Sequence, residues 1–180
     1  MNRIAIIGNA AGGKSTLARA LSRVHNIPLL VIDHVQFTPN WGRADEADVF
    51  AAQKRILAND RWIIDGFGPW PSIEERFERA DTVILIDYPL QTHCTMAAER
   101  QVASALGKHL HEAPGCRFVD VTRRMFESIF RVHEQIRPKI LASLQRYRMT
   151  GKVITITSPE ELDRLAEEKF QLGADWRKDA

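Results

Sequence analysis

The chain has 180 residues, 44% hydrophobic and 27% charged, which fits one domain spanning 1–180 and excludes a disordered or low-complexity protein. Its 25 basic and 23 acidic residues give a net charge of only +2, so no global attraction to nucleic acid or membranes is expected. Two cysteines cannot form a disulfide framework, and the apolar run Ile4–Ile7 is too short for a signal peptide or a membrane span. We therefore expect a cytoplasmic protein.

Predicted strands and helices alternate along the first half of the chain. Residues 3–7 are typical of a buried strand, and apolar side chains at helical spacing follow over residues 14–24. A second strand is predicted at 29–32, a helix at about 46–59 and a third strand at 62–64. This alternation favours a parallel sheet with helices on both faces.

The second half repeats the pattern around a long insertion. Strands are predicted at 82–86 and 153–157, and Ser158 begins a capping box that starts the final helix. Between these strands, helices are predicted over 90–106 and 120–147, the second kinked by a proline. We expect a helical, lid-like insertion at about 100–125 in place of a separate domain.

The segment Gly8–Ser15 fits the pattern G-x-x-x-x-G-K-[ST] at every fixed position, after a strand and before a helix. Glycines let backbone amides turn inward around a phosphate, and the helix N-terminus adds unpaired donors. Lys14 would contact the β- and γ-phosphates, and the Ser15 hydroxyl would bind Mg²⁺. The alternative is a glycine-rich turn with an exposed lysine. The predicted nucleotide-binding residues are Gly8, Asn9, Ala10, Ala11, Gly12, Gly13, Lys14, Ser15 and Thr16.

No N-K-x-D guanine motif occurs, so a small P-loop kinase fits better than a GTPase. The segments IAIIGNAAGGKSTLARAL, IPLLVIDHVQFTPNW, RWIIDGF, RFERADTVILIDYP, RPKIL and KVITITSPEELDRL occur in order over nearly the whole chain. In these segments and their order, the chain resembles adenylate-kinase-like proteins, and it is most similar to the DNA topology modulation (FlaR-like) proteins among them. The resemblance implies a three-layer α/β/α sandwich of the P-loop kinase fold, with five parallel strands in the order 2-3-1-4-5.

The resemblance to adenylate kinases stops after the Asp65-Gly66-Phe67 segment. Those kinases continue with Pro-Arg, and the arginine helps to hold the acceptor phosphates. Here Gly68-Pro69-Trp70-Pro71 follows, and the next arginine is Arg76. Trp70, like Trp41 in the preceding loop region, is expected either to stack on an acceptor ring or to anchor its loop.

Three aspartates follow predicted strands, at the sheet edge where ligands of α/β proteins bind. Asp33 is expected to take the acceptor's proton or hold a Mg²⁺-bound water, with a helix cap as the alternative. By resemblance, Asp65 orients Mg²⁺-bound water or the acceptor; the alternative is a simple Asp-Gly turn. Asp87 ends a strand like that of a Walker B motif and is either a Mg²⁺ ligand or a cap.

Transfer of a phosphoryl group spreads negative charge that cations must neutralise. The insertion and its flanks supply Arg100, Arg123, Arg124, Arg131 and Arg137. We favour Arg100 and Arg137 as catalytic, with Arg76 as a candidate on the acceptor side. Some of the others are expected to pair with Glu127 or Glu134 on the surface.

These patterns predict a kinase that transfers a phosphoryl group from Mg-ATP to a small acceptor, a nucleoside or nucleotide. Its predicted catalytic residues are Lys14, Asp33, Arg100 and Arg137; its acceptor-binding residues are Asp33, Asp65 and Arg76; its metal ligands are Ser15 and Asp87. A non-nucleotide alcohol as acceptor stays open. The alternative class is a regulatory nucleotide-binding protein that acts on DNA through basic side chains of 123–148.

Overall fold

The computed structural model describes residues 1–108, 111–148 and 150–177. Its centre is a five-stranded parallel sheet in the order β2-β5-β1-β6-β7. In chain order these are the second, third, first, fourth and fifth strands of the sheet, so the predicted order is confirmed. The strands are β1 (Arg3–Gly8), β2 (Leu29–Val31), β5 (Trp62–Asp65), β6 (Thr82–Ile86) and β7 (Val153–Ile156).

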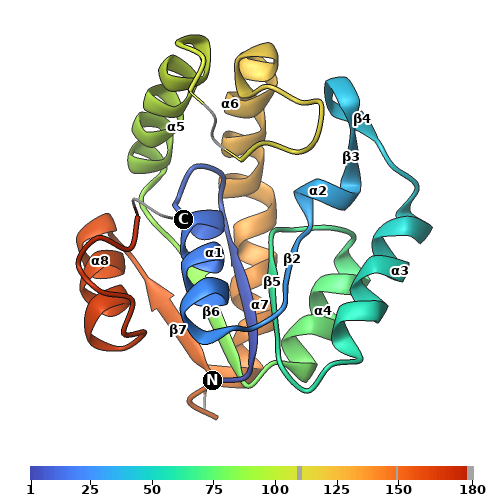
Figure 1. Ribbon diagram of the computed structural model, residues 1–180, viewed down its shortest axis with the longest axis vertical. Helices are drawn as coiled ribbons and strands as arrows, with labels where there is room; N and C mark the ends of the chain where they lie inside the picture. The colour runs from blue at the N-terminus through green and yellow to red at the C-terminus, as the bar shows by residue number, and fades with distance from the viewer. Residues whose placement is uncertain (109–110, 149, 178–180) are drawn as a thin grey trace.

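Helices cover both faces of the sheet, which confirms the predicted three layers (Figure 1). One face carries α1 (Lys14–His25) and α8 (Pro159–Glu168). The other carries α3 (Glu46–Leu57), α4 (Trp70–Arg79) and α7 (Arg137–Arg148). The strands are apolar on both sides because both sides are buried.

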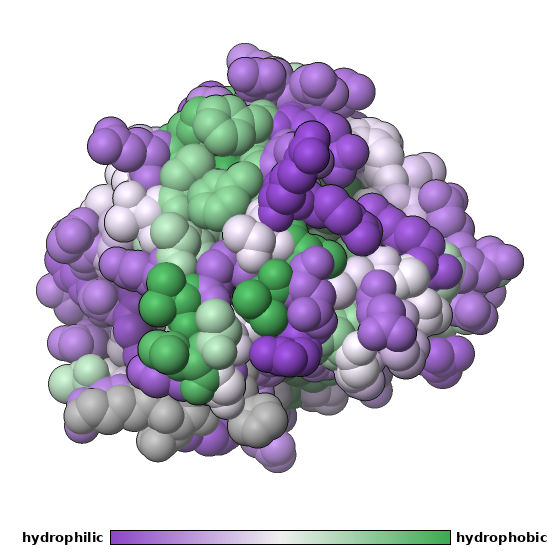
Figure 2. Space-filling model, turned by 90° about the horizontal axis from the view of Figure 1, so that it is seen from above, coloured by the Kyte–Doolittle hydropathy of each residue, from purple (hydrophilic) through white to green (hydrophobic). Residues whose placement is uncertain are grey.

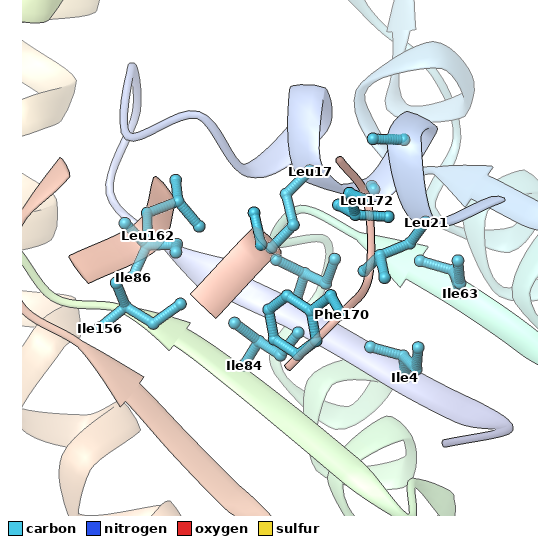
Figure 3. Packing of buried hydrophobic residues seen from close by; sticks show 14 of the residues in the cluster. Ile4, Leu17, Leu21, Ile63, Ile84, Ile86, Ile156, Leu162, Phe170 and Leu172 are labelled. Carbon is cyan, nitrogen blue, oxygen red and sulfur yellow. The ribbon is translucent and has the colours of Figure 1, made fainter. Parts of the chain in front are cut away.

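Alternation along β1 divides the core into two clusters. Ile4 and Ile6 pack with α1 and α8, as the close view in Figure 3 shows for Ile4, whereas Ala5 and Ile7 pack with the opposite helices. Successive strand residues point to opposite faces, so each strand contributes to both clusters. Between β7 and α8, at the N-cap of α8, the Ser158 hydroxyl accepts a hydrogen bond from the Glu161 amide, as the capping box predicts.

The insertion forms a helical arm above the sheet edge. It contains α5 (Leu90–Ala105), the short η2 (Phe118–Val121) and α6 (Thr122–Arg131). A π-helical turn, η3 (Val132–Ile136), separates α6 from α7. The predicted kink therefore lies in the turn just before Pro138, where the missing proline N–H interrupts regular helical bonding.

Two further segments, residues 33–43 and 70–79, form elements that were not predicted from the sequence. After the short α2 (Asp33–Gln36), the strands β3 (Phe37–Thr38) and β4 (Gly42–Arg43) pair as a hairpin around η1 (Pro39–Trp41). The helix α4 follows the Gly-Pro loop that begins at Gly66. In the described part of the chain, no helix is long and apolar enough to cross a membrane.

Gly8, the last residue of β1, cannot carry a side chain. Its φ is +144°, and a Cβ added there would lie 2.2 Å from the Ile86 carbonyl oxygen. We expect Gly8→Ala to lower the free energy of unfolding by about 3 kcal/mol or more, since the strand β6 backbone would have to move. Urea unfolding measures this loss, and Gly107→Ala, at a glycine with open space around it, is the matched control.

Candidate active site

The predicted phosphate loop joins β1 to α1 at the carboxyl edge of the sheet. Its backbone bends through positive φ angles at Ala11 (60°) and Gly13 (82°). α1 begins at Lys14 with no side-chain cap, and within the described residues no carbonyl accepts from the amides of Gly12 to Ser15. These amides are unpaired donors at the positive end of a helix dipole, as phosphate binding requires.

The Lys14 ammonium folds back over this loop and donates to the Asn9 carbonyl oxygen at 2.7 Å. Burial lowers the pKa of Lys14, whereas the negative charges of Asp65 and Asp33 raise it. A buried ammonium held by one neutral carbonyl is weakly compensated, so a phosphate oxygen would be a stronger partner. The position suits a cation that moves onto a bound polyphosphate.

Asp65 and Ser15 bring two side-chain oxygen atoms together next to the loop. The Ser15 hydroxyl donates to Asp65 Oδ2 at 2.5 Å, and Asp65 is 1% exposed. Burial raises the pKa of Asp65, and the nearby Lys14 and Ser15 act in the opposite direction. Its second oxygen, Oδ1, is buried with no hydrogen-bond partner among the described residues.

This arrangement fits Mg²⁺. An unpartnered carboxylate oxygen next to a serine hydroxyl supplies hard oxygen ligands, and Mg²⁺ on nucleotides needs only one or two carboxylates besides phosphate and water. The described residues hold no cluster of three or more His, Cys, Asp or Glu side chains that would form a complete metal cage. The site thus fits a metal that arrives with its nucleotide.

Asp33 is the first residue of α2, directly after β2, and its side chain is exposed. It does not cap the helix, because the cap position is Ile32; its Oδ1 accepts from Gln36 Nε2 at 2.7 Å. A Cβ on Gly66 would lie 3.8 Å from that oxygen, which places Asp33 beside the residue after Asp65. Asp33 is thus an exposed carboxylate at the same sheet edge.

Arg100 approaches this group from α5. Its guanidinium lies 4.0 Å from the centre of the Phe118 ring, and its Nε is buried with no hydrogen-bond partner in the described chain. Burial lowers the pKa of Arg100 to about 10, with Asp33 opposing that shift. Arg100 is therefore a cation close to Lys14 and Asp33, and the negative charges of Asp33 and Glu112 both favour its charged form.

Arg137 and Asp87 bind each other and line a small pocket together with Gly8, Asn9 and His93. Arg137 Nε and one terminal nitrogen donate to the two Asp87 oxygens at 2.6 and 2.8 Å. This bidentate pair ties the start of α7 to the end of β6. Arg137, which was predicted to contact phosphate, and Asp87, which was predicted to bind the metal, therefore bind each other in this structure.

The fold has solved counterparts. No family model matches the chain, and no curated protein matches it. A shikimate kinase from Acinetobacter baumannii in complex with shikimate superimposes with a TM-score of 0.57 at 14% identity, covering 96% of this chain and 92% of that one. A gluconokinase from Sinorhizobium meliloti 1021 gives a TM-score of 0.52 at 11% identity, covering 99% and 94%. The chain has a P-loop kinase fold. Likeness at these identities establishes the fold alone.

Within this kinase fold, Arg76 is turned inward. It is 1% exposed, and its guanidinium donates to the carbonyls of Gly66, Phe67 and Ser72. Burial lowers its pKa to about 10, and Asp65 opposes the shift. All three nitrogen positions are used on the backbone, so Arg76 holds the loop after Asp65 and does not present a cation to an acceptor.

The β3–β4 hairpin and the insertion are joined above the sheet edge. The Asn40 amide donates to the Gly115 carbonyl at 2.9 Å, and the Trp41 indole donates to the Arg117 carbonyl at 2.8 Å. Trp41 is buried with Cys116, while Trp70 packs into the main core. Both tryptophans anchor their segments, so the anchoring alternative holds for each.

His93 is a site residue that the sequence analysis missed. Its Nδ1 lies 2.9 Å from the Ala10 carbonyl oxygen, so the ring must be protonated at Nδ1 to donate there. A Cβ on Gly12 would lie 3.0 Å from the ring, and the Tyr88 ring stacks on its other side at 5.3 Å. The signal in the sequence was weak: one histidine in the first turn after the fourth strand's Asp-Tyr-Pro.

His93 should make stability depend on pH. Burial, reinforced by Lys14, lowers its pKa to about 4, against an ordinary 6.5. The folded state therefore binds fewer protons between these values, and stability present above pH 6.5 is lost as the pH falls toward 4. Between pH 7 and 5 this group should remove about 2 kcal/mol from the free energy of unfolding.

Urea unfolding of the wild type and His93→Asn at both pH values measures the effect. The asparagine amide keeps a donor for the Ala10 carbonyl but does not titrate. The free energy of unfolding of His93→Asn should therefore fall by about 2 kcal/mol less than that of the wild type between pH 7 and 5. Equal losses in the two proteins would show that His93 protonates freely in the folded state.

Proposed function

We propose that the chain is a phosphotransferase that moves the γ-phosphoryl group of Mg-ATP to a small acceptor. The observation that carries this is the meeting, at one sheet edge, of unpaired loop amides, the Lys14 ammonium and the Ser15–Asp65 pair. Similar folds occur in a shikimate kinase and a gluconokinase, which supports the class of reaction. The donor would be held by residues 8–16.

The metal would be bound by Ser15 together with Asp65, whose unpartnered oxygen supplies the second ligand. When bound, Mg²⁺ would neutralise negative charge on the phosphates and so favour transfer of the phosphoryl group. Asp87 could join only if its pair with Arg137 opened, which would also release Arg137 toward the phosphates. Lys14 and Arg100 are two cations near the site for which the described residues show no ion pair with a carboxylate.

Asp33 is the proposed general base. As the acceptor oxygen bonds to the γ-phosphorus, its proton passes to Asp33, and the bond from phosphorus to the bridging oxygen breaks to leave ADP. Exposure lets this carboxylate reach a bound hydroxyl. Closure of the insertion over the site would keep water from competing for the phosphoryl group.

Acceptor binding is proposed beside Asp33 and Asp65. Arg76 would contribute there by fixing the loop, because each of its three nitrogens donates to a backbone carbonyl. This favours an acceptor without a phosphate at that position: a nucleoside or a non-nucleotide alcohol over a nucleoside monophosphate. The expected resemblance to DNA topology modulation (FlaR-like) proteins has no support from the family models, none of which matches the chain. Arg123, on the surface considered for DNA, is paired with Glu127 at 2.8 Å.

A panel of acceptors incubated with γ-labelled ATP tests the proposal. The panel contains nucleosides, nucleoside monophosphates, sugars and other small alcohols, each with Mg²⁺ or with a chelator. We expect label in one alcohol class and none without Mg²⁺. Label that is released only as inorganic phosphate, at one rate across the whole panel, would contradict phosphoryl transfer.

A further inference from the structure

The outer face of α6 carries a feature that the kinase chemistry does not use. Seven side chains line a shallow groove of about 560 Å³ along α6 and η3: Arg123, Phe126, Glu127, Phe130, Arg131, Glu134 and Gln135. Their spacing of three and four residues places them on one helical stripe. Met125 and Ile129, on the opposite side of the helix, are buried in the protein. The stripe is therefore a second, outward-facing surface.

This stripe is apolar at its centre and exposed. Phe130 is 46% exposed, and Phe126 is half-buried beside it. Val102 and Leu106, on the neighbouring α5, are also exposed. In Figure 2, which looks onto the end of the molecule where α5 and α6 stand, apolar side chains gather on one side of the view. Large apolar side chains grouped on a surface mark an interface.

The charges on the stripe identify the partner. The midpoints of Arg123 and Glu134, of Glu127 and Arg131, and of Phe126 and Phe130 fall within one residue of each other along the stripe. Reading the stripe backwards thus exchanges each arginine for a glutamate. A second copy of the same stripe, laid antiparallel about a two-fold axis, would place every arginine near a glutamate.

We propose that the protein forms a two-fold symmetric homodimer through the α6–η3 stripe. The phenylalanines of the two copies pack at the axis. Each Arg131 lies by Glu127 of the second copy, and each Arg123 lies by Glu134. Within one copy Arg123 already pairs with Glu127 at 2.8 Å, so these two charges would be shared between that pair and the second copy. The stripe is electrically neutral as a whole, and a copy of this chain laid in reverse offers an opposite charge to each of its four charged groups.

Sedimentation analysis over a range of protein concentrations tests the dimer. The variants are Glu127→Arg, Arg131→Glu and the double exchange. Arg55→Glu is the control, because Arg55 is an exposed arginine on α3, outside the stripe. Each single reversal places like charges together twice, so it should weaken dimerisation by about tenfold or more. The double exchange restores opposite charges and should recover the dimer, and the control should leave it unchanged.

Three results would overturn the proposal. The first is a wild type that stays monomeric at every concentration. The second is a dimer whose affinity neither single reversal lowers, and the third is a double exchange that does not restore dimerisation. Circular dichroism of each variant, all altered only at exposed positions, separates loss of dimer from loss of fold.

Discussion

Replacing Lys14 with methionine should lower phosphoryl transfer by about 10²- to 10³-fold and weaken ATP binding, while leaving the fold intact. The side chain keeps its length but loses the charge that stabilises the β- and γ-phosphate oxygens. Stability should change little, because burial already lowers the pKa of Lys14 and, within the described residues, its ammonium donates to the Asn9 carbonyl alone. Turnover of γ-labelled ATP and calorimetric titration with ATP measure the two effects.

Lys152→Met is the matched control. Lys152 is also a lysine bonded to backbone carbonyls, of Phe77, Glu78 and Ala80, but at the opposite end of β7 from the site. It should lower stability without changing turnover of the folded protein. If Lys14→Met kept full ATP affinity and turnover, the assignment of residues 8–16 as the phosphate-binding loop would be wrong.

Asp65→Asn should separate function from stability. The pKa of Asp65 is raised, chiefly by burial, so its ionised form is costly in the folded protein even with Lys14 nearby. A neutral amide of the same size removes that cost, and the free energy of unfolding should stay equal or increase. Without the carboxylate, the Mg²⁺-dependent part of ATP affinity should be lost, and turnover should fall by about 10²-fold or more.

Asp87→Asn distinguishes the two candidate metal carboxylates. Its partner is Arg137, so this change should lower stability and leave most of the Mg²⁺ dependence in place. Titrations of each variant with ATP, with Mg²⁺ and with a chelator, provide the comparison. A Mg²⁺ effect that survives in Asp65→Asn and disappears in Asp87→Asn would reverse the assignment of these two residues.

Much of the fold could be predicted because its signals are local. The strand β6 is an uninterrupted apolar run, and the capping box fixes the start of α8. The hairpin around Trp41 could not be predicted, since its strands have only two residues each and depend on contacts with Gly115 and Cys116, more than seventy residues later. Such short strands have almost no periodicity of their own.

The same contrast between local signals and contacts distant in the sequence applies to the candidate site. Lys14 and Ser15 are fixed by a local motif, whereas the partners of charged groups are decided by tertiary packing. Asp65 and Asp87 both end apolar strands, and nothing in their sequence surroundings indicates that one faces Ser15 and the other Arg137. Arg76 likewise gives no local sign that it is buried against backbone carbonyls.

Binding of a polyphosphate by the amides of Gly12 to Ser15 can be tested by nuclear magnetic resonance of these backbone amides during titration with Mg-ADP and Mg-ATP. We expect large, saturable shifts at these four amides and at Lys14 Nζ, with little change at the far end of the sheet. Saturating nucleotide that leaves these amides unmoved would contradict it.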